Sequence, residues 1–187
     1  MKYAYLPGFA LSTCKYSLGL CGAEALKSAL LKMLLNGTSL SCAKQQAAEF
    51  TSKFLIGKVH RHAMERINWH RGQNHRIVLL SASPDIYLAS LASELRADTL
   101  ICTHVRSKGG YLTGELAGEN CKGEEKLKRL SAEATLQGSD WNESYGYGNA
   151  AEDIPFLQSL GHPTAVNPDR KLKQAASERG WKIESWL

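Results

Sequence analysis

Aspartate is absent from the first 84 residues of this 187-residue chain, and glutamate is scarce in the same region. The only acids in residues 1–76 are Glu24, Glu49 and Glu65, against 11 lysines and arginines. This excludes a pair of catalytic aspartates at the start of the chain, which one common class of enzymes requires. Residues 1–76 carry a net charge of +8, whereas residues 77–187, with 12 basic and 15 acidic residues, carry −3.

Long apolar runs and paired cysteines are missing as well. The unbroken apolar runs are only a few residues long, so we expect no transmembrane segment. The five cysteines form no CxxC pair and have no histidine at zinc spacing, so we expect reduced, buried thiols in a cytoplasmic protein. Pro7 and Gly8 interrupt the apolar start, and Leu20 stands where a lipobox ending at Cys21 needs a small residue. These departures argue against export.

What remains is a globular composition, with 43% hydrophobic and 22% charged residues. The length allows one domain, or a core with a small appendage. The first third has a helical pattern, and from residue 76 short apolar strands alternate with helices, which predicts βαβ units and a parallel sheet covered on both faces. We expect short or irregular helix in 1–22, helices at 23–35, 38–57, 59–71, 84–95, 122–136, 153–160 and 169–179, strands at 76–80, 99–103, 143–147, 163–167 and 181–184, and a hairpin around 109–114.

The residues that follow the first expected strand suit an anion. Ligands of an open parallel sheet bind beyond the carboxyl ends of its strands. Ser81 and Ala82 follow the strand at 76–80, and a hydroxyl with successive backbone N–H groups can hold a phosphate. A plainer interpretation is that Ser83 caps the next helix and Pro84 occupies its first position.

Two further positions could carry chemistry. Asn149 and Asp153 follow the strand at 143–147 and offer oxygen ligands for a hard cation such as Mg²⁺, unless Asp153 merely caps a helix. Lys122 stands where a helix is expected to begin, a place that disfavours a cation. It therefore needs an anionic ligand or a carboxylate partner, or else is an ordinary surface lysine. We expect Lys126 and Lys128 to be surface lysines.

Histidines and arginines are concentrated between residues 60 and 76. Four of the six histidines lie within His60–His75, with no ligand spacing that indicates a metal site. The stretch lacks interleaved aromatic residues in the pattern of a nucleic-acid surface and any known binding module. We interpret it as a basic, solvated helix and expect no nucleic-acid partner.

Taken together, these motifs resemble a known family. A strand ending in Ser-Ala-Ser, a helix start Asn-Cys-Lys-Gly-x-x-Lys, and a strand followed by Gly-Asn-x-x-x-Asp and Asn-Pro-Asp occur in this order. The chain resembles the haloacid dehalogenase superfamily, in its subfamily IB of phosphoserine-phosphatase-like hydrolases. The similarity runs from about residue 23 to the C-terminus and is most specific in 70–83, 112–126 and 147–169.

The resemblance implies a fold and a mechanism. Residues 1–65 would form a helical cap over the substrate, and 66–187 a Rossmann-like α/β core. Ser81, with Ala82, would bind the phosphoryl group, and Lys122 would neutralise its charge. Asn149 and Asp153 would lie at the Mg²⁺ site, with Asp153 also orienting Lys122, and the catalytic set would be Ser81, Lys122 and Asp153.

One motif of the family is absent from these 187 residues. The family begins with Asp-x-Asp-x-Thr at the end of a central strand, where the first aspartate attacks phosphorus and the second acts as general acid and base. Nothing before Asp85 matches it, so that strand and its aspartates are expected to be missing. Residues 1–6 could substitute for the strand, the flanking strands could pair directly, or the gap could persist.

We therefore expect a Mg²⁺-dependent phosphatase acting on a small phosphorylated substrate, inactive as this chain stands and with weak or no Mg²⁺ binding. One alternative is a non-catalytic remnant that binds a phosphorylated ligand or a partner. Another, suggested by the apolar and basic residues 1–35, is a lipid-phosphate phosphatase at a membrane surface. The oligomeric state is left open.

Overall fold

The computed structural model describes residues 13, 15, 17 and 22–186. Several predictions concern residues outside this described part. They are most of the helix expected in residues 1–22, the possible substitute strand at 1–6, and the thiols of Cys14 and Cys21. Contacts divide the chain into two compact units, of which the first comprises residues 1–57, 84–91 and 103–119 and the second 58–83, 92–102 and 120–187. Two later segments thus join the N-terminal helices in the first unit. The division into a cap of residues 1–65 and a core of residues 66–187 stays a prediction.

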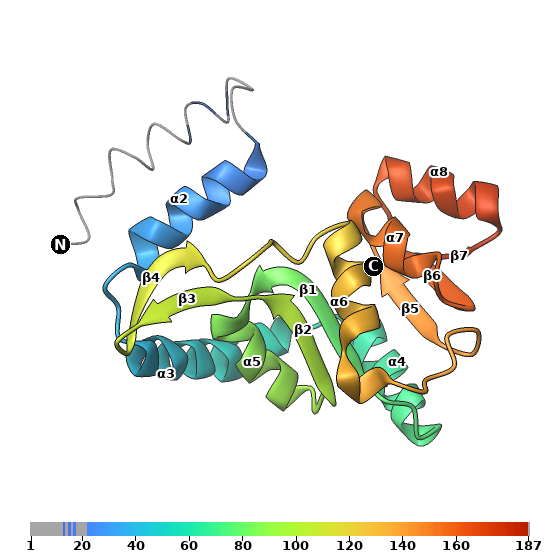
Figure 1. The fold of residues 1–187 in the computed structure, drawn as a ribbon. Coiled ribbons are helices and arrows are strands. Elements are labelled where there is room, and N and C mark those ends of the chain that lie inside the picture. Colours follow the sequence, from blue (N-terminus) through green and yellow to red (C-terminus); the bar gives the residue numbers. More distant parts are fainter. Residues whose placement is uncertain (1–12, 14, 16, 18–21, 187) are drawn as a thin grey trace. The chain divides into compact units, whose positions relative to one another are not determined.

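The element order is helical first and then mixed, as expected (Figure 1). The helices are α2 (Ala23–Leu35), α3 (Leu40–Phe50), α4 (Arg61–Gly72), α5 (Asp85–Glu94), α6 (Glu124–Ala132), α7 (Ile154–Leu157) and α8 (Arg170–Arg179). The strands are β1 (Val78–Pro84), β2 (Thr99–Thr103), β3 (Val105–Lys108), β4 (Tyr111–Leu116), β5 (Tyr145–Gly148), β6 (His162–Val166) and β7 (Lys182–Glu184). A π-helical turn η2 (Thr51–Leu55) and short 3₁₀ turns η3 (Ile56–Lys58), η4 (Ala134–Leu136) and η5 (Ala151–Asp153) complete the order.

The first unit is built on the antiparallel hairpin β3–β4. Ala43 of α3 packs with Val105 and Leu112 of the hairpin in a small core. Helix α2 packs on β4, where a Cβ at Gly114 would lie 2.6 Å from Cα of Lys32. Gly114 also has φ +73°, a conformation that glycine adopts without strain. The absence of a side chain there therefore sets how closely helix and strand approach.

The helix that follows α2 has a different buried face from the expected one. Sequence periodicity places Phe50 and Phe54 on the face shared with Ala43 and Ala47. In the structure the buried positions are Ala43, Ala47 and Thr51, while Phe50 and Phe54 are exposed. The physical reason is the π-helical turn at Thr51–Leu55, which has more residues per turn than an α-helix and so changes which side chains share the buried face.

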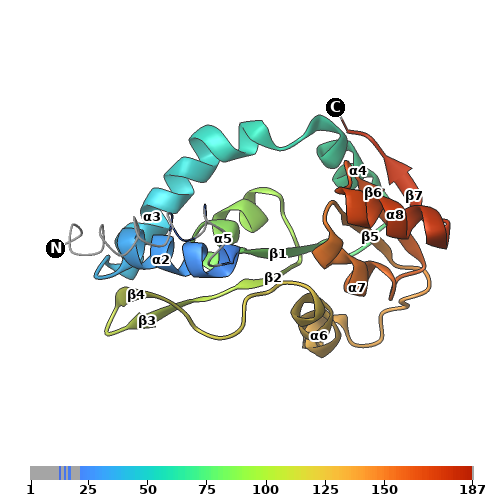
Figure 2. The ribbon, with the colours of Figure 1, turned by 90° about the horizontal axis from the view of Figure 1, so that it is seen from above.

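The second unit contains the larger core. Its buried residues come from β2, α6, α7, β6, α8 and the segment before α6, and they are Ile101, Cys121, Leu130, Phe156, Leu157, Ala165, Leu172 and Ala176. The parallel sheet β5–β6–β7 is covered on one face by α7 and α8 (Figure 2). On the other face, Trp69 and His70 of α4 contact tyrosine rings. The chain thus has the expected α/β fold with helices on both faces of a parallel sheet.

The strands do not form one continuous sheet. Among the described residues β1 pairs with β2 alone, and β5 pairs with β6 alone. The flanking strands have therefore not closed up on each other. A strand of the family between β1 and β5 stays a prediction.

Two further expectations concern the membrane and the thiols. Over the described part of the chain, no helix combines the length and apolar character needed to cross a bilayer. Cys102 and Cys121 are buried, as expected, but Cys42 is exposed. The expectation that every thiol is buried is therefore wrong for Cys42. Cys42 lies on the outer face of α3, whereas the next residue, Ala43, is on the buried face.

Candidate active site

The turn after β5 is organised around one buried carboxylate. The backbone N–H groups of Asn149 and Ala150 both donate to Oδ2 of Asp153, at 2.9 and 3.2 Å, and Asp153 is 4% exposed. Gly148 makes this approach possible, since a Cβ built there would lie 2.7 Å from Cβ of Asp153. The two N–H donors replace part of the hydration that the carboxylate loses on burial.

The remaining oxygen of this carboxylate pairs with a lysine. Nζ of Lys126 donates to Oδ1 of Asp153, and the two side chains are 12% and 6% exposed. The expectation that Lys126 is a surface lysine is therefore wrong. Lys126 lies one helical turn before Leu130, a buried core residue, so the two share the inward face of α6. Its ammonium group is 5.6 Å from the centroid of the Phe156 ring.

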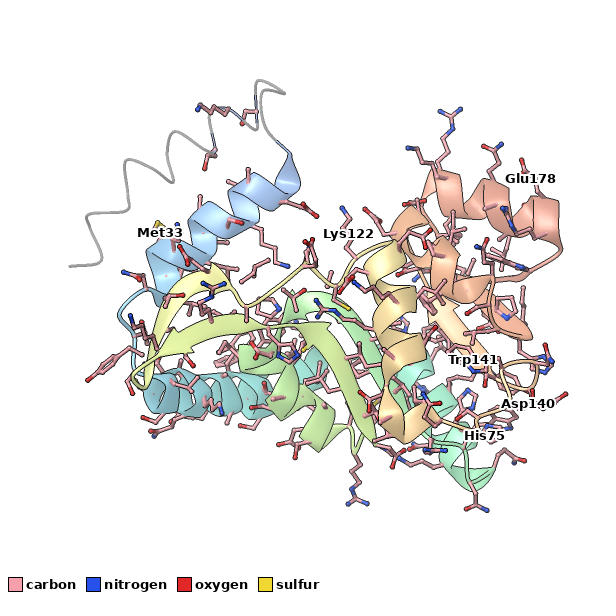
Figure 3. All side chains as sticks on the ribbon, viewed as in Figure 1. Met33, His75, Lys122, Asp140, Trp141 and Glu178 are labelled. Carbon is pink, nitrogen blue, oxygen red and sulfur yellow. The ribbon has the colours of Figure 1, made fainter. Side chains whose placement is uncertain are left out.

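Lys122 has a different partner from the expected one. It precedes α6 (Figure 3), and its Nζ lies 2.9 Å from Oε1 of Glu152. Both side chains are more than a third exposed, and the hydrogen bond from Lys122 lowers the pKa of Glu152 below its usual value. Lys126 thus pairs with Asp153, and Lys122 pairs with Glu152. This follows because α6 begins after Gly123, two residues later than expected.

A second carboxylate fixes the turn to the next helix. Asp169 accepts hydrogen bonds from the backbone N–H groups of Leu172 and Ala151, both at 2.8 Å, and these bonds lower the pKa of Asp169. Its own N–H donates to the carbonyl oxygen of Asn149 at 2.9 Å. Asp169 therefore caps α8 and holds the turn of Asp153 at the same time, which explains the Asn-Pro-Asp motif.

Ser81 lies within β1, because the strand continues to Pro84 instead of ending at residue 80. Its Oγ accepts a hydrogen bond of 3.1 Å from the backbone N–H of Ser83. Accepting this bond leaves the hydroxyl proton as a donor for an anion. Convergence of Ser81 and Ala82 with Asp153 on one cleft stays a prediction.

The turn does not by itself fit a magnesium ion. Both oxygens of Asp153 are engaged, one by Lys126 and one by two N–H groups. The amide of Asn149 is neutral, and no cluster of three or more acidic, histidine or cysteine side chains in the described residues could hold a metal. Hard cations bind several oxygens, usually with carboxylates among them. Asp153 is instead placed as the residue that positions Lys126.

Comparison with known proteins decides the family. The sequence model of the haloacid dehalogenase-like hydrolases matches residues 4–158. The chain belongs to this family. Phosphoserine phosphatases are among the proteins to which the chain is similar in sequence or in fold.

Its relatives come from several bacteria. A protein of Streptomyces azureus described by the inhibition of morphological differentiation is 31% identical over 83% of this chain and 56% of its own length. A phosphoserine phosphatase of Mycobacterium tuberculosis is 26% identical over 81% of the chain and 49% of its length. A Bordetella pertussis structure of unknown function shares the fold, with a TM-score of 0.82 at 24% identity over 94% of this chain and 79% of that one. The chain thus spans about half the length of these two curated relatives.

Proposed function

We propose that this chain is the cap and phosphate-binding portion of a phosphomonoester hydrolase. The observation that carries the proposal is the buried ion pair between Lys126 and Asp153 at the carboxyl end of β5. Burial of an ion pair costs desolvation free energy and often adds little stability, so a role in binding an anionic ligand would explain why this pair lies here. The relatives whose printed names include a phosphatase support the same reaction class.

In this proposal each residue has a separate task. Lys126 neutralises the charge of the phosphoryl group, a role that the family resemblance assigns to Lys122. Lys122 lies nearer the solvent with Glu152. The hydroxyl group of Ser81 donates a hydrogen bond to a phosphoryl oxygen. Asp153 is a positioning residue, because it holds Lys126 and has both oxygens engaged.

The reaction also needs a nucleophile. In the family an aspartate attacks phosphorus and water then hydrolyses the aspartyl-phosphate. None of the first 84 residues is an aspartate, so we propose that these 187 residues bind a phosphate monoester but do not turn it over. A strand bearing the aspartate pair would also bring the carboxylates that a magnesium ion requires.

The test is a hydrolysis assay of the chain with p-nitrophenyl phosphate and Mg²⁺. We expect turnover far below a typical enzyme rate of ~1 s⁻¹ or more, and turnover on adding an N-terminal segment with the Asp-x-Asp pair of a relative. The extended protein should lose activity in Lys126→Ala and retain most of it in Lys122→Ala. Turnover by the 187 residues that is lost in Lys126→Ala would overturn the missing-nucleophile proposal.

The same experiment separates the alternatives. If the extended protein binds phosphate but never hydrolyses the ester, the chain is a non-catalytic binding module. If hydrolysis requires lipid vesicles, the substrate is a lipid phosphate. Binding that is unchanged in Lys126→Ala would contradict the assignment of the site.

A further inference from the structure

One face of the sheet β5–β6–β7 forms the floor of a cavity that the candidate active site does not use. Gly146 faces Leu157 and Leu160 on the side of α7, so Tyr145 and Tyr147 lie on the opposite face. These two tyrosines line a cavity of about 480 Å³. A volume in this range accommodates a small ligand.

The cavity begins at the other ends of the strands from the candidate active site. His162 and Lys182 are the first residues of β6 and β7, and both line it. Asp153, in contrast, follows the carboxyl end of β5. The cavity is therefore a separate place in the same unit.

Two cations in the cavity share a single carboxylate. Nη2 of Arg66 and Nζ of Lys182 both contact Oε1 of Glu184, at 3.1 and 2.5 Å. Burial alone would raise the pKa of Glu184, but hydrogen bonds from Lys182 and Trp186 and the charges of Lys182 and Arg66 lower it below its usual value. Glu184 is therefore ionised at neutral pH and compensates one of the two cations.

A third cation adds to this excess of positive charge in the cavity. The guanidinium of Arg179 lies 5.5 Å from the centroid of the Trp181 ring, and its Nη1 donates to the carbonyl oxygen of Ala175 at 3.3 Å. No carboxylate among residues 22–186 is within ion-pair distance of it. The lining thus has three cations and one carboxylate, and two positive charges remain uncompensated.

An aromatic stack ends in the same cavity. The ring of Tyr145 stacks on His75 at 5.7 Å and on His162 at 4.4 Å, with interplanar angles of 25° and 19°. His162 lines the cavity and its side chain is 44% exposed, whereas His75 is not part of the lining. The outer face of the His162 ring is therefore where a flat group can extend the stack.

We propose that this cavity binds a phosphate monoester attached to a planar ring, as in a nucleoside monophosphate. A phosphate monoester carries roughly −1.5 to −2 charges at pH 7, which matches the two uncompensated cations. The phosphate contacts Arg179 and Lys182, since guanidinium and ammonium groups bind phosphate through charge-assisted hydrogen bonds. The ring continues the stack of His75, Tyr145 and His162. The inference does not depend on the proposed hydrolysis.

The test is titration calorimetry of the whole chain with adenosine monophosphate, inorganic phosphate and adenosine. We expect saturable binding of adenosine monophosphate with a Kd below about 1 mM, and weaker binding of either half alone. Arg179→Gln should weaken binding by about tenfold or more, the effect of one lost charge-assisted hydrogen bond. His162→Ala should weaken it as well, and His162→Phe should restore it.

A matched variant separates this cavity from the candidate active site. Arg170→Gln makes the same charge change as Arg179→Gln, at the exposed start of α8, and should leave the Kd unchanged. Adenosine monophosphate bound only at the proposed hydrolysis site would keep its affinity in both Arg179→Gln and His162→Ala. Absence of binding, equal effects of Arg179→Gln and Arg170→Gln, or binding that both Arg179→Gln and His162→Ala leave unchanged would each overturn the proposal. Equal affinity for inorganic phosphate and adenosine monophosphate would overturn the role of the ring.

Discussion

At the scale of single residues, the two lysines of the candidate active site differ sharply in environment. Lys126 and Asp153 are almost fully buried, whereas Lys122 and Glu152 are more than a third exposed. A buried pair that loses one partner leaves an uncompensated charge away from water. An exposed pair is screened by solvent and contributes little to stability. Burial, and not the presence of an ion pair, therefore decides the effect of each lysine.

We predict that Lys126→Ala lowers the free energy of unfolding by about 3–5 kcal/mol, and that Lys122→Ala lowers it by about 1 kcal/mol or less. Urea denaturation at pH 7 measures both. The two variants remove the same side chain four residues apart, so Lys122→Ala is the matched control. Equal losses in the two proteins would show that the environment of Lys126 has been misassigned.

A second residue-scale feature is the buried His70. Its Nδ1 and Nε2 lie 2.9 Å from Nδ1 of His75 and from the hydroxyl oxygen of Tyr147, respectively. Burial is the largest cause that lowers the pKa of His70 to about 4, and the charges of His75 and Arg66 act in the same direction. The folded protein therefore holds this ring neutral under conditions where the unfolded chain protonates it.

We predict a pH dependence of stability from this shift. Between the unfolded value of about 6.5 and the folded value of about 4, the unfolded state binds the proton more tightly. The contribution of His70 to stability is thus fully present above about pH 6.5 and falls as the pH decreases toward 4. The loss of unfolding free energy between pH 7 and pH 5 should be smaller in His70→Gln than in the unsubstituted protein. An identical loss in both proteins would contradict the assignment.

At the scale of elements, the strand β5 illustrates how much the sequence could predict. Its sequence Tyr-Gly-Tyr-Gly places tyrosines on one face and glycines on the other. The glycines permit two close approaches, by Leu160 to Gly146 and by Asp153 to Gly148. Alternation predicts two faces, but only the neighbouring elements show why one face must lack side chains.

The bounds of other elements could be predicted where the sequence pattern that sets them is local. Helix α2 and strand β2 have the expected bounds, because their apolar periodicity and flanking residues are local. The pairing of Lys126 with Asp153 was harder to predict, because a lysine in the first turn of a charged helical segment usually faces water. The four-residue spacing of Lys126 and Leu130 could have shown that both lie on one face of the helix. The depth of burial of Lys126 could not be predicted, because it depends on the packing of α6 in the core.

We predict that Gly148→Ala disrupts the turn of Asp153. The new Cβ would lie 2.7 Å from Cβ and 2.9 Å from Oδ2 of Asp153, so the carboxylate must move away from its N–H donors. We expect a loss of about 1–3 kcal/mol in unfolding free energy, as for other overpacked sites, and weaker phosphate binding. Gly72→Ala is the control, since a Cβ there meets nothing within 4 Å. A fully stable Gly148→Ala protein with unchanged phosphate binding would count against the described turn.

At the scale of the whole molecule, the described residues form two cores that share no residue. The smaller core contains Ala43, Val105 and Leu112, and the larger one is centred on β6, α7 and α8. Each core belongs to one of the two compact units. A substitution within one unit should therefore act first on that unit.

We predict that Gly114→Ala loosens the first unit selectively. A methyl group at Gly114 would meet backbone atoms of α2, at 2.6 Å from Cα of Lys32 and 2.9 Å from the carbonyl oxygen of Leu31, and backbone yields less readily than a side-chain tip. Hydrogen exchange should accelerate in α2 and β4 and stay unchanged in α7 and α8. Faster exchange in all four elements would show that the units open together.

The division into units has a consequence for synthesis on the ribosome. The first unit is assembled from residues 1–57, 84–91 and 103–119, so α2 emerges long before the strand β4 on which it packs. Until residue 119 has left the exit tunnel, Leu31 and its apolar neighbours on α2 lack their partner. Pairing of such distant segments is slow compared with local helix formation. The nascent chain therefore has a window in which a chaperone that binds apolar helices can compete with β4 for α2.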